Sequence, residues 1–107
     1  MDSSYGKVML DIKGTNLSDE DKNLISNKHV GGLILFSRNF ESYNQLKTLI
    51  KQIKSVKKNI LISVDQEGGR VQRLDGEFTS IPSMREIANF AFKNNDYKIF
   101  REIGWLI

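Results

Sequence analysis

The sequence contains no cysteine and only one histidine, His29. Without cysteine there is no disulfide, no thiolate nucleophile and no cysteine-ligated zinc site. A single histidine also excludes a metal site built from several histidines of this chain. The first twenty residues carry charges and no uninterrupted apolar run, which excludes a signal peptide and a membrane span there. We therefore expect a cytoplasmic protein with no membrane partner.

Charge is close to balanced, because 16 basic and 13 acidic residues give a net charge of +3. The basic residues are scattered and aromatic residues do not alternate with them, so no nucleic-acid partner is predicted. The densest basic stripe recurs at steps of four, three and four residues, as on one face of a helix: Lys47, Lys51, Lys54 and Lys58. Such a stripe is typical of a solvated outer surface, and an anion-binding face is the alternative.

Three short apolar runs lie in the first 64 residues, at 8–10, 33–36 and 60–64. Runs of this length are too short for helices and are typical of strands buried in a sheet. Gly31-Gly32 precedes the second run, and we expect it to break the chain before that strand. The spacing leaves room for one helix between successive strands, which predicts right-handed βαβ units and a parallel sheet.

Two helices are expected between these strands, because each gap contains a hydroxyl residue followed three positions later by a side chain that can complete a capping box. These pairs are Ser18–Asp21 and Ser42–Gln45. We expect Leu24-Ile25 on the buried side of the first helix. The apolar residues of the second helix share one face: Leu46, Leu49, Ile50, Ile53 and Val56.

The composition of the chain changes after Val64. Residues 65–82 are polar and rich in glycine and arginine, and a connection of this length is more often functional than idle. A third capping box, Ser83–Glu86, opens a helix whose inward side we expect to carry Met84, Ile87, Ala88 and Ala91. Residues 94–96 break the chain before a last helix that carries Phe100, Ile103, Gly104 and Leu106.

The chain ends on the apolar residues 105–107, and three parallel strands leave both edges of a sheet bare. Complete folds avoid bare edges by adding strands or by closing into a barrel. We therefore expect an α/β fold in which residues 1–107 are one N-terminal part of a domain. This part would form the first three βα units, an incomplete set, of a (β/α)8 TIM barrel of about 250 residues. A small flavodoxin-like βα protein is the alternative, although residues 11–14 make a poor phosphate-binding loop.

In such barrels, ligands meet residues at the carboxyl ends of the strands. This rule selects Asp11, Ser37-Arg38-Asn39 and the segment Asp65–Arg70. The last is the richest, because Gly68-Gly69 lets the backbone turn tightly or approach a ligand. Two arginines in or near it, Arg70 and Arg73, can donate to hydroxyls or to a carboxylate.

Structural roles are open alternatives for these residues. Asp65 could pair with Arg70 or Arg73 and cap the loop, and Asp11 could satisfy local backbone donors. Arg38-Asn39 could bridge loops at the rim of the barrel. His29 precedes a strand at the end away from the expected ligand face and is expected at the surface. Asp65 and Glu67 are two apart, whereas the paired carboxylates of a glycosidase normally come from separate strands, so we do not assign them as such a pair.

Four segments resemble the N-terminal portion of bacterial β-N-acetylhexosaminidases of glycoside hydrolase family 3. They are Val8–Asp11, Gly31–Asn39, Val64–Arg73 and Glu102–Ile107. The resemblance covers nearly the whole chain and is most specific in the ten-residue motif of Val64–Arg73, whereas Leu74–Asn95 matches loosely.

The resemblance implies a retaining glycosidase on a single TIM barrel, without cofactor or metal. The family removes terminal, non-reducing N-acetylglucosamine from peptidoglycan fragments, such as N-acetylglucosaminyl-1,6-anhydro-N-acetylmuramic acid and its peptide-bearing forms, in cell-wall recycling. The family's two sugar-binding residues in this motif fall on Asp65 and Arg73. The implied partner is this small carbohydrate substrate, with neither nucleic acid nor membrane, and the full-length enzyme would be a monomer.

The family's catalytic residues have no counterpart in this sequence. A Lys-His pair, a histidine-containing loop that acts as acid/base and an aspartate nucleophile in a Ser-Asp-Asp segment are all missing, and His29 matches none of them. We assign no catalytic residue and expect no hydrolysis by these 107 residues alone, because a double displacement needs both a nucleophile and a proton donor. The alternative is a non-catalytic sugar-binding module that keeps Asp65 and Arg73.

Overall fold

The computed structural model describes residues 5–107 and confirms the mixed α/β class. The chain forms two compact units, Met1–Val64 and Asp65–Ile107. In the described residues no helix is long and apolar enough to cross a lipid bilayer.

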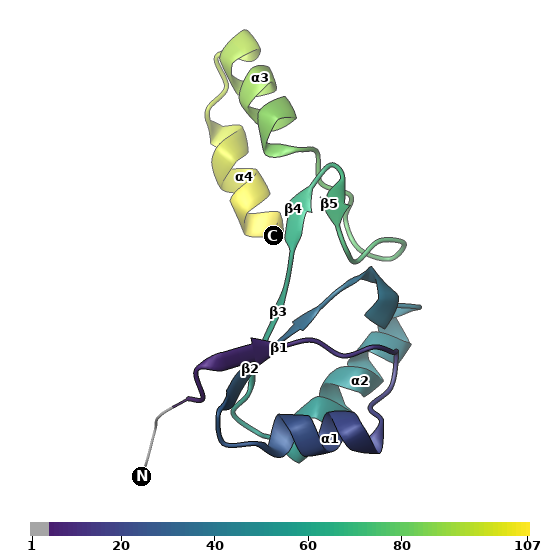
Figure 1. Ribbon diagram of the computed structural model, residues 1–107. Coiled ribbons are helices and arrows are strands. Elements are labelled where there is room, and N and C mark those ends of the chain that lie inside the picture. The colour runs from purple at the N-terminus through teal and green to yellow at the C-terminus, as the bar shows by residue number, and fades with distance from the viewer. Residues whose placement is uncertain (1–4) are drawn as a thin grey trace. The chain divides into compact units, whose positions relative to one another are not determined.

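The first unit is a three-stranded parallel sheet covered by helices (Figure 1). Its elements are β1 (Val8–Leu10), α1 (Asp19–Ser26), β2 (Val30–Leu35), the short 3₁₀ helix η1 (Ser37–Asn39), α2 (Tyr43–Val56) and β3 (Leu61–Val64). The strand order is β1-β2-β3, and both strand pairs are parallel. The predicted succession of βαβ units is therefore confirmed. Successive crossovers of the same hand in this order place both helices on one face of the sheet, where α1 and α2 contact each other.

Strand β2 begins at Val30, so the prediction that Gly31-Gly32 would break the chain before the strand is wrong. A Cβ atom on Gly31 would lie 1.9 Å from the carbonyl oxygen of Gly6, and a Cβ on Gly32 would lie 2.6 Å from Cε of Met9. At Gly31 the Gly6 backbone leaves no room for a Cβ atom, whereas at Gly32 that space is filled by the flexible side chain of Met9.

The core of this unit lies between the sheet and the two helices. Its fully buried apolar side chains come from all layers: Ile25, Leu33, Leu49, Ile53 and Ile60. The flanking strands are less covered than we predicted, because β1 and β3 are the edges of the sheet. Leu61 of β3 is 59% exposed. Leu24 is 48% exposed and does not share the buried side with Ile25, since an eight-residue helix offers only a narrow inward stripe.

Local capping explains where the helices of this unit begin. The box at α1 is confirmed: Asp21 N donates to Ser18 Oγ at 3.1 Å, and Ser18 N donates to Asp21 Oδ2 at 2.9 Å. At α2 only half of the predicted box forms, with Gln45 N donating to Ser42 Oγ at 3.2 Å. The Gln45 side chain instead bridges to another loop, because its Nε2 donates to the Thr15 carbonyl at 2.8 Å.

The second unit contains a short hairpin followed by two helices. Its elements are β4 (Gln66–Gly68), β5 (Val71–Gln72), α3 (Met84–Asn94) and α4 (Lys98–Leu106). We predicted residues 65–82 as one irregular loop, but β4 and β5 pair in antiparallel fashion within it. The predicted break between the helices is confirmed, since Asn95 adopts the left-handed conformation with φ of 51°.

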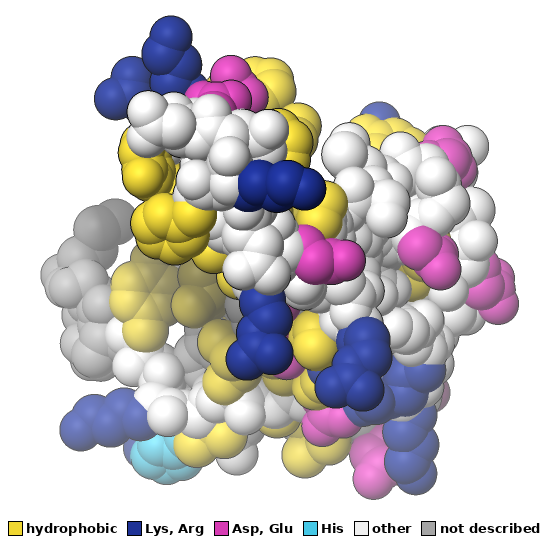
Figure 2. Space-filling model, turned by 90° about the horizontal axis from the view of Figure 1, so that it is seen from above, with side chains coloured by type: hydrophobic (Ala, Val, Ile, Leu, Met, Phe, Trp, Pro, Cys, Tyr) yellow, Lys and Arg dark blue, Asp and Glu magenta, His cyan; other side chains and the backbone are white. Residues whose placement is uncertain are grey.

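Apolar side chains of the second unit are only partly covered. Ile87 and Ala91 of α3 are buried as predicted, whereas Met84 is 48% exposed, because it occupies the first helical position after the cap. Figure 2 shows hydrophobic side chains on the face of the molecule turned toward the viewer. Among the exposed large hydrophobic side chains of the described residues, Trp105 is the most exposed, at 84%.

The start of α3 generates a pH-dependent prediction. Ser83 Oγ and Ser83 N both donate to Glu86 Oε2, at 2.7 and 2.9 Å, and these bonds lower the pKa of Glu86 below its ordinary value of 4.5. A lowered pKa in the folded state means that the stabilisation is present above pH 4.5 and is lost as the pH falls through the folded-state pKa. In Ser83→Ala, the carboxyl titration of Glu86, followed by carbon-13 NMR, is expected to move upward. Ser80→Ala is the control, and an identical midpoint in all three proteins would contradict the capping account.

Candidate functional site

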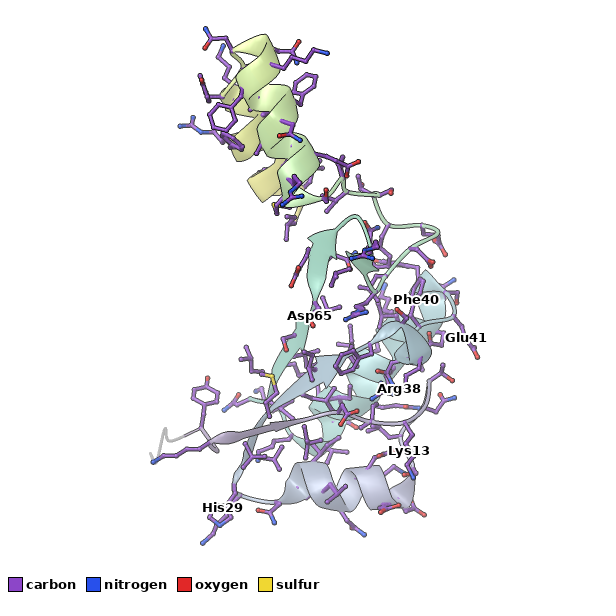
Figure 3. All side chains as sticks on the ribbon, turned by 45° about the horizontal axis from the view of Figure 1, so that its top comes forward. Lys13, His29, Arg38, Phe40, Glu41 and Asp65 are labelled. Atoms are coloured by element: carbon purple, nitrogen blue, oxygen red, sulfur yellow. The ribbon has the colours of Figure 1, made fainter. Side chains whose placement is uncertain are left out.

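The candidate site is the base of the β4–β5 hairpin, where Asp65 and Arg73 face each other. Asp65 directly follows β3, at the point where the chain leaves that strand (Figure 3), and Arg73 directly follows β5. Asp65 Oδ2 lies 3.8 Å from Arg73 Nη2. Of the two arginines considered as partners of Asp65, Arg73 forms the ion pair, while Arg70 lies exposed in the hairpin turn.

The exposure of this pair matters for binding. The Asp65 side chain is 47% exposed and that of Arg73 is 30% exposed, so solvent reaches both groups. At 3.8 Å the two paired atoms are attracted electrostatically but are beyond the distance of a hydrogen bond. A hydroxyl-bearing ligand can donate to a carboxylate and accept from a guanidinium, and the hairpin presents one of each side by side.

Two glycines form the turn of the hairpin and allow it to lie close to residues 81–83. Gly68 and Gly69 have φ values of 83° and 59°, a region that side chains rarely adopt. A Cβ atom on Gly68 would lie 2.3 Å from the carbonyl oxygen of Pro82. Gly69 N donates to the Ile81 carbonyl at 2.7 Å. The close approach that we expected at this glycine pair is therefore to residues 81–83 of the chain itself.

Two glutamine side chains hold the segment that follows the hairpin, and the sequence reasoning missed both. Gln66 and Gln72 are partners in the β4–β5 register, and each donates from Nε2 to the Leu74 carbonyl, at 2.9 and 3.1 Å. Gln72 also accepts from Ile81 N at 2.8 Å. The available signal was their placement on either side of the Gly-Gly turn, because residues paired across a hairpin share a face.

At the ends of β1 and β2, polar side chains bridge loops. Arg38 pairs with Asp11, and its Nε donates to the Ile12 carbonyl at 3.2 Å. Asn39 is fully buried, and its Nδ2 donates to the carbonyls of Ile12 and Gly14 at 3.0 and 2.8 Å. The bridging role of Arg38-Asn39 is confirmed, and the Asp11 carboxylate is bonded to an arginine rather than to backbone donors alone.

The remaining candidates are surface residues. His29 is exposed at the start of β2, at the opposite end of the sheet from Arg38 (Figure 3), as expected. The lysine stripe of α2 and its C-terminus is also exposed at all four positions. Among residues 5–107, no group of three or more His, Cys, Asp or Glu side chains could hold a metal ion.

Comparison with known proteins assigns this chain to a family of carbohydrate enzymes. Residues 5–107 match the family model of the glycosyl hydrolase family 3 N-terminal domain. The beta-hexosaminidase of Idiomarina loihiensis is 44% identical over 102 residues, which cover 94% of this chain and 31% of that protein. The beta-hexosaminidase of Pseudomonas aeruginosa is 43% identical over 102 residues, which cover 95% of this chain and 30% of that protein. The chain thus spans less than a third of the length of these relatives.

Solved structures agree with this assignment. The structure of NagZ from Neisseria gonorrhoeae in complex with N-trifluoroacetyl-D-glucosamine matches with a TM-score of 0.84 and 40% identity, covering 89% of this chain and 29% of that one. A glycoside hydrolase family 3 beta-N-acetylglucosaminidase from Paenibacillus matches with a TM-score of 0.68 and 31% identity, covering 90% and 20%. The flavodoxin-like alternative is therefore wrong.

The hairpin turn yields a prediction about stability. Gly68→Ala is expected to lower the free energy of unfolding by about 1–3 kcal/mol more than Gly76→Ala, because only the first methyl group overlaps other backbone atoms. Gly76 is the matched control, since its φ is 61° but a Cβ atom there would meet nothing within 4 Å. Urea unfolding followed by circular dichroism measures the difference. Equal losses in the two variants would mean that the contact with Pro82 does not constrain the hairpin.

Proposed function

Because the chain belongs to the glycosyl hydrolase family 3 N-terminal domain family, we propose that it forms the first three βα units of the (β/α)8 barrel of a β-N-acetylhexosaminidase. The parallel order β1-β2-β3 with a helix in each connection supports this placement. So does the length comparison, because the matching relatives are more than three times as long as the segment they share with this chain. A barrel of this kind needs about 250 residues.

Within this barrel, Asp65 and Arg73 bind the sugar. The observation that carries the proposal is their pairing at 3.8 Å directly beyond β3, since barrel ligands bind at the carboxyl ends of the strands. The carboxylate of Asp65 accepts hydrogen bonds from two adjacent sugar hydroxyls, and the guanidinium of Arg73 donates to a hydroxyl oxygen. Binding would replace the direct ion pair with two sets of charge-assisted bonds to one pyranose ring.

A relative supports a proposal for the substrate class. NagZ from Neisseria gonorrhoeae is described in complex with N-trifluoroacetyl-D-glucosamine, an N-acyl glucosamine. We infer that the complete enzyme removes terminal N-acetylglucosamine from peptidoglycan fragments such as N-acetylglucosaminyl-1,6-anhydro-N-acetylmuramic acid and its peptides. It would do so in the cytoplasm during cell-wall recycling, as a monomer and without metal or cofactor.

The part played by this chain is binding rather than bond cleavage. By holding the hydroxyls of the terminal sugar, Asp65 and Arg73 fix the orientation of the ring and hence of its anomeric carbon. The nucleophile and the acid/base of the retaining mechanism would come from the remainder of the barrel. The 107 residues alone are then inactive toward a 4-nitrophenyl N-acetyl-β-D-glucosaminide.

A chimeric barrel tests this proposal. Residues 5–107 are joined to the part of the Pseudomonas aeruginosa enzyme that follows its matched segment, and hydrolysis of the 4-nitrophenyl glycoside is measured. We expect the chimera to be active, and Asp65→Asn or Arg73→Met to lower kcat/KM by about tenfold to a hundredfold, the range for losing charged hydrogen bonds.

Matched controls separate binding from folding. Asp75→Asn and Arg85→Met make the same chemical changes at exposed positions of the same unit and are expected to retain activity. The melting temperature of each variant shows whether the barrel is intact. A folded chimera whose activity is unaffected by Asp65→Asn and Arg73→Met would overturn the sugar-binding assignment. Hydrolysis by the 107-residue chain alone would overturn the assignment of the catalytic residues to the remainder.

A further inference from the structure

Gln66 links the two residues of the candidate site through the backbone. Gln66 follows Asp65 directly in the chain, and its side chain reaches across the hairpin to the end of β5. Gln66 Oε1 accepts from Arg73 N at 3.0 Å and from Leu74 N at 3.3 Å, and Gln66 Nε2 donates to the Leu74 carbonyl at 2.9 Å. One side chain thus makes three hydrogen bonds to two consecutive residues.

These bonds fix the residue that carries the guanidinium. β5 ends at Gln72, so the regular strand pairing stops one residue before Arg73. Gln66 takes over at that point, because its Oε1 accepts from Arg73 N in place of a backbone carbonyl. The contacts are partly buried, so losing them would leave backbone groups poorly hydrated as well as loosening the chain.

We propose that Gln66 is a positioning residue for sugar binding, acting through Arg73. It holds the backbone of Arg73 so that the guanidinium stays 3.8 Å from the Asp65 carboxylate before any ligand arrives. Pre-organisation of this kind strengthens binding, because the side chain does not have to be ordered when the sugar binds. This inference rests on the proposed function of Asp65 and Arg73, and it assigns a role to a residue that touches no sugar.

Gln72 provides a matched control within the same hairpin. It is the register partner of Gln66 and also donates to the Leu74 carbonyl, at 3.1 Å. Its other bonds go to the Thr79 carbonyl at 3.0 Å and to Ile81 N at 2.8 Å, so these three bonds hold residues other than Arg73. Gln72→Met therefore loosens the loop without removing the acceptor for Arg73 N.

The first arm of the test uses the 107-residue chain and amide hydrogen exchange. Gln66→Met is expected to accelerate exchange of the Arg73 amide by about tenfold, which corresponds to the loss of one hydrogen bond. In Gln72→Met the same amide is expected to change by less than about twofold, while the Ile81 amide exchanges faster. An Arg73 amide that is unaffected by Gln66→Met, or affected equally by both variants, would overturn the inference.

The second arm measures a functional readout in the chimeric barrel. Gln66→Met is expected to raise KM about tenfold with kcat changed by less than about twofold, because it weakens binding of the sugar in ground state and transition state alike. Gln66→Glu keeps an acceptor for Arg73 N and should raise KM less. Gln72→Met should lower the melting temperature with little change in KM.

The outcomes separate this inference from the proposal on which it depends. If Asp65→Asn and Arg73→Met lower kcat/KM as expected but Gln66→Met leaves KM unchanged, the sugar site stands and the positioning role fails. If Gln66→Met and Gln72→Met raise KM equally, Gln66 supports the loop only, and the inference is again overturned. If neither Asp65→Asn nor Arg73→Met has an effect, the proposed function itself fails.

Discussion

The reversal of the chain after β3 is the constraint on which the candidate site depends. Asp65 and Arg73 are eight positions apart, so an extended chain would separate their backbones by about 26 Å. The turn at Gly68 and Gly69 instead brings their side chains to within 3.8 Å. The reversal has local causes. Both glycines have positive φ values, and the carbonyls of Ile81 and Pro82 occupy the space that a side chain on Gly68 would need.

In this region, side-chain amides supply the hydrogen bonds that backbone pairing supplies in a sheet. The hairpin strands are only three and two residues long, too short to hold a connection of this length by backbone pairing alone. Gln66 and Gln72 supply the missing donors and acceptors, and their bonds converge on the Leu74 carbonyl. The buried side chains of Leu74 and Ile81 then anchor the connection by apolar contact. The result is an ordered loop that presents two opposite charges.

Local features of the fold could be predicted from the sequence. The caps at Ser18 and Ser83 depend on partners three residues away, so the pattern of residue types alone identifies them. Gln45 shows the limit of that reasoning, because its side chain bonds Thr15, which lies thirty positions earlier in the chain. The positions of Gly31 and Leu61 depended on tertiary structure as well, namely on which segment approaches β2 and on which strand becomes an edge.

The candidate site was likewise predictable from the sequence only in part. The residue types and the family motif nominated Asp65 and Arg73, but only the hairpin register shows which arginine pairs with the aspartate. The role of Gln66 was missed, because its place opposite Gln72 becomes informative only once the Gly68-Gly69 turn is recognised as the turn of a hairpin. Arg38 and Asn39 were correctly expected to bridge loops, since polar residues that follow a buried strand must satisfy the backbone groups exposed there.

The most direct test of the central claim is a crystal structure of the chimeric barrel with N-acetylglucosamine bound. We expect one pyranose ring with Asp65 carboxylate oxygens and the Arg73 guanidinium both at hydrogen-bond distance, about 3 Å, from its hydroxyl groups. A sugar bound in the barrel without contact to either side chain would contradict this claim.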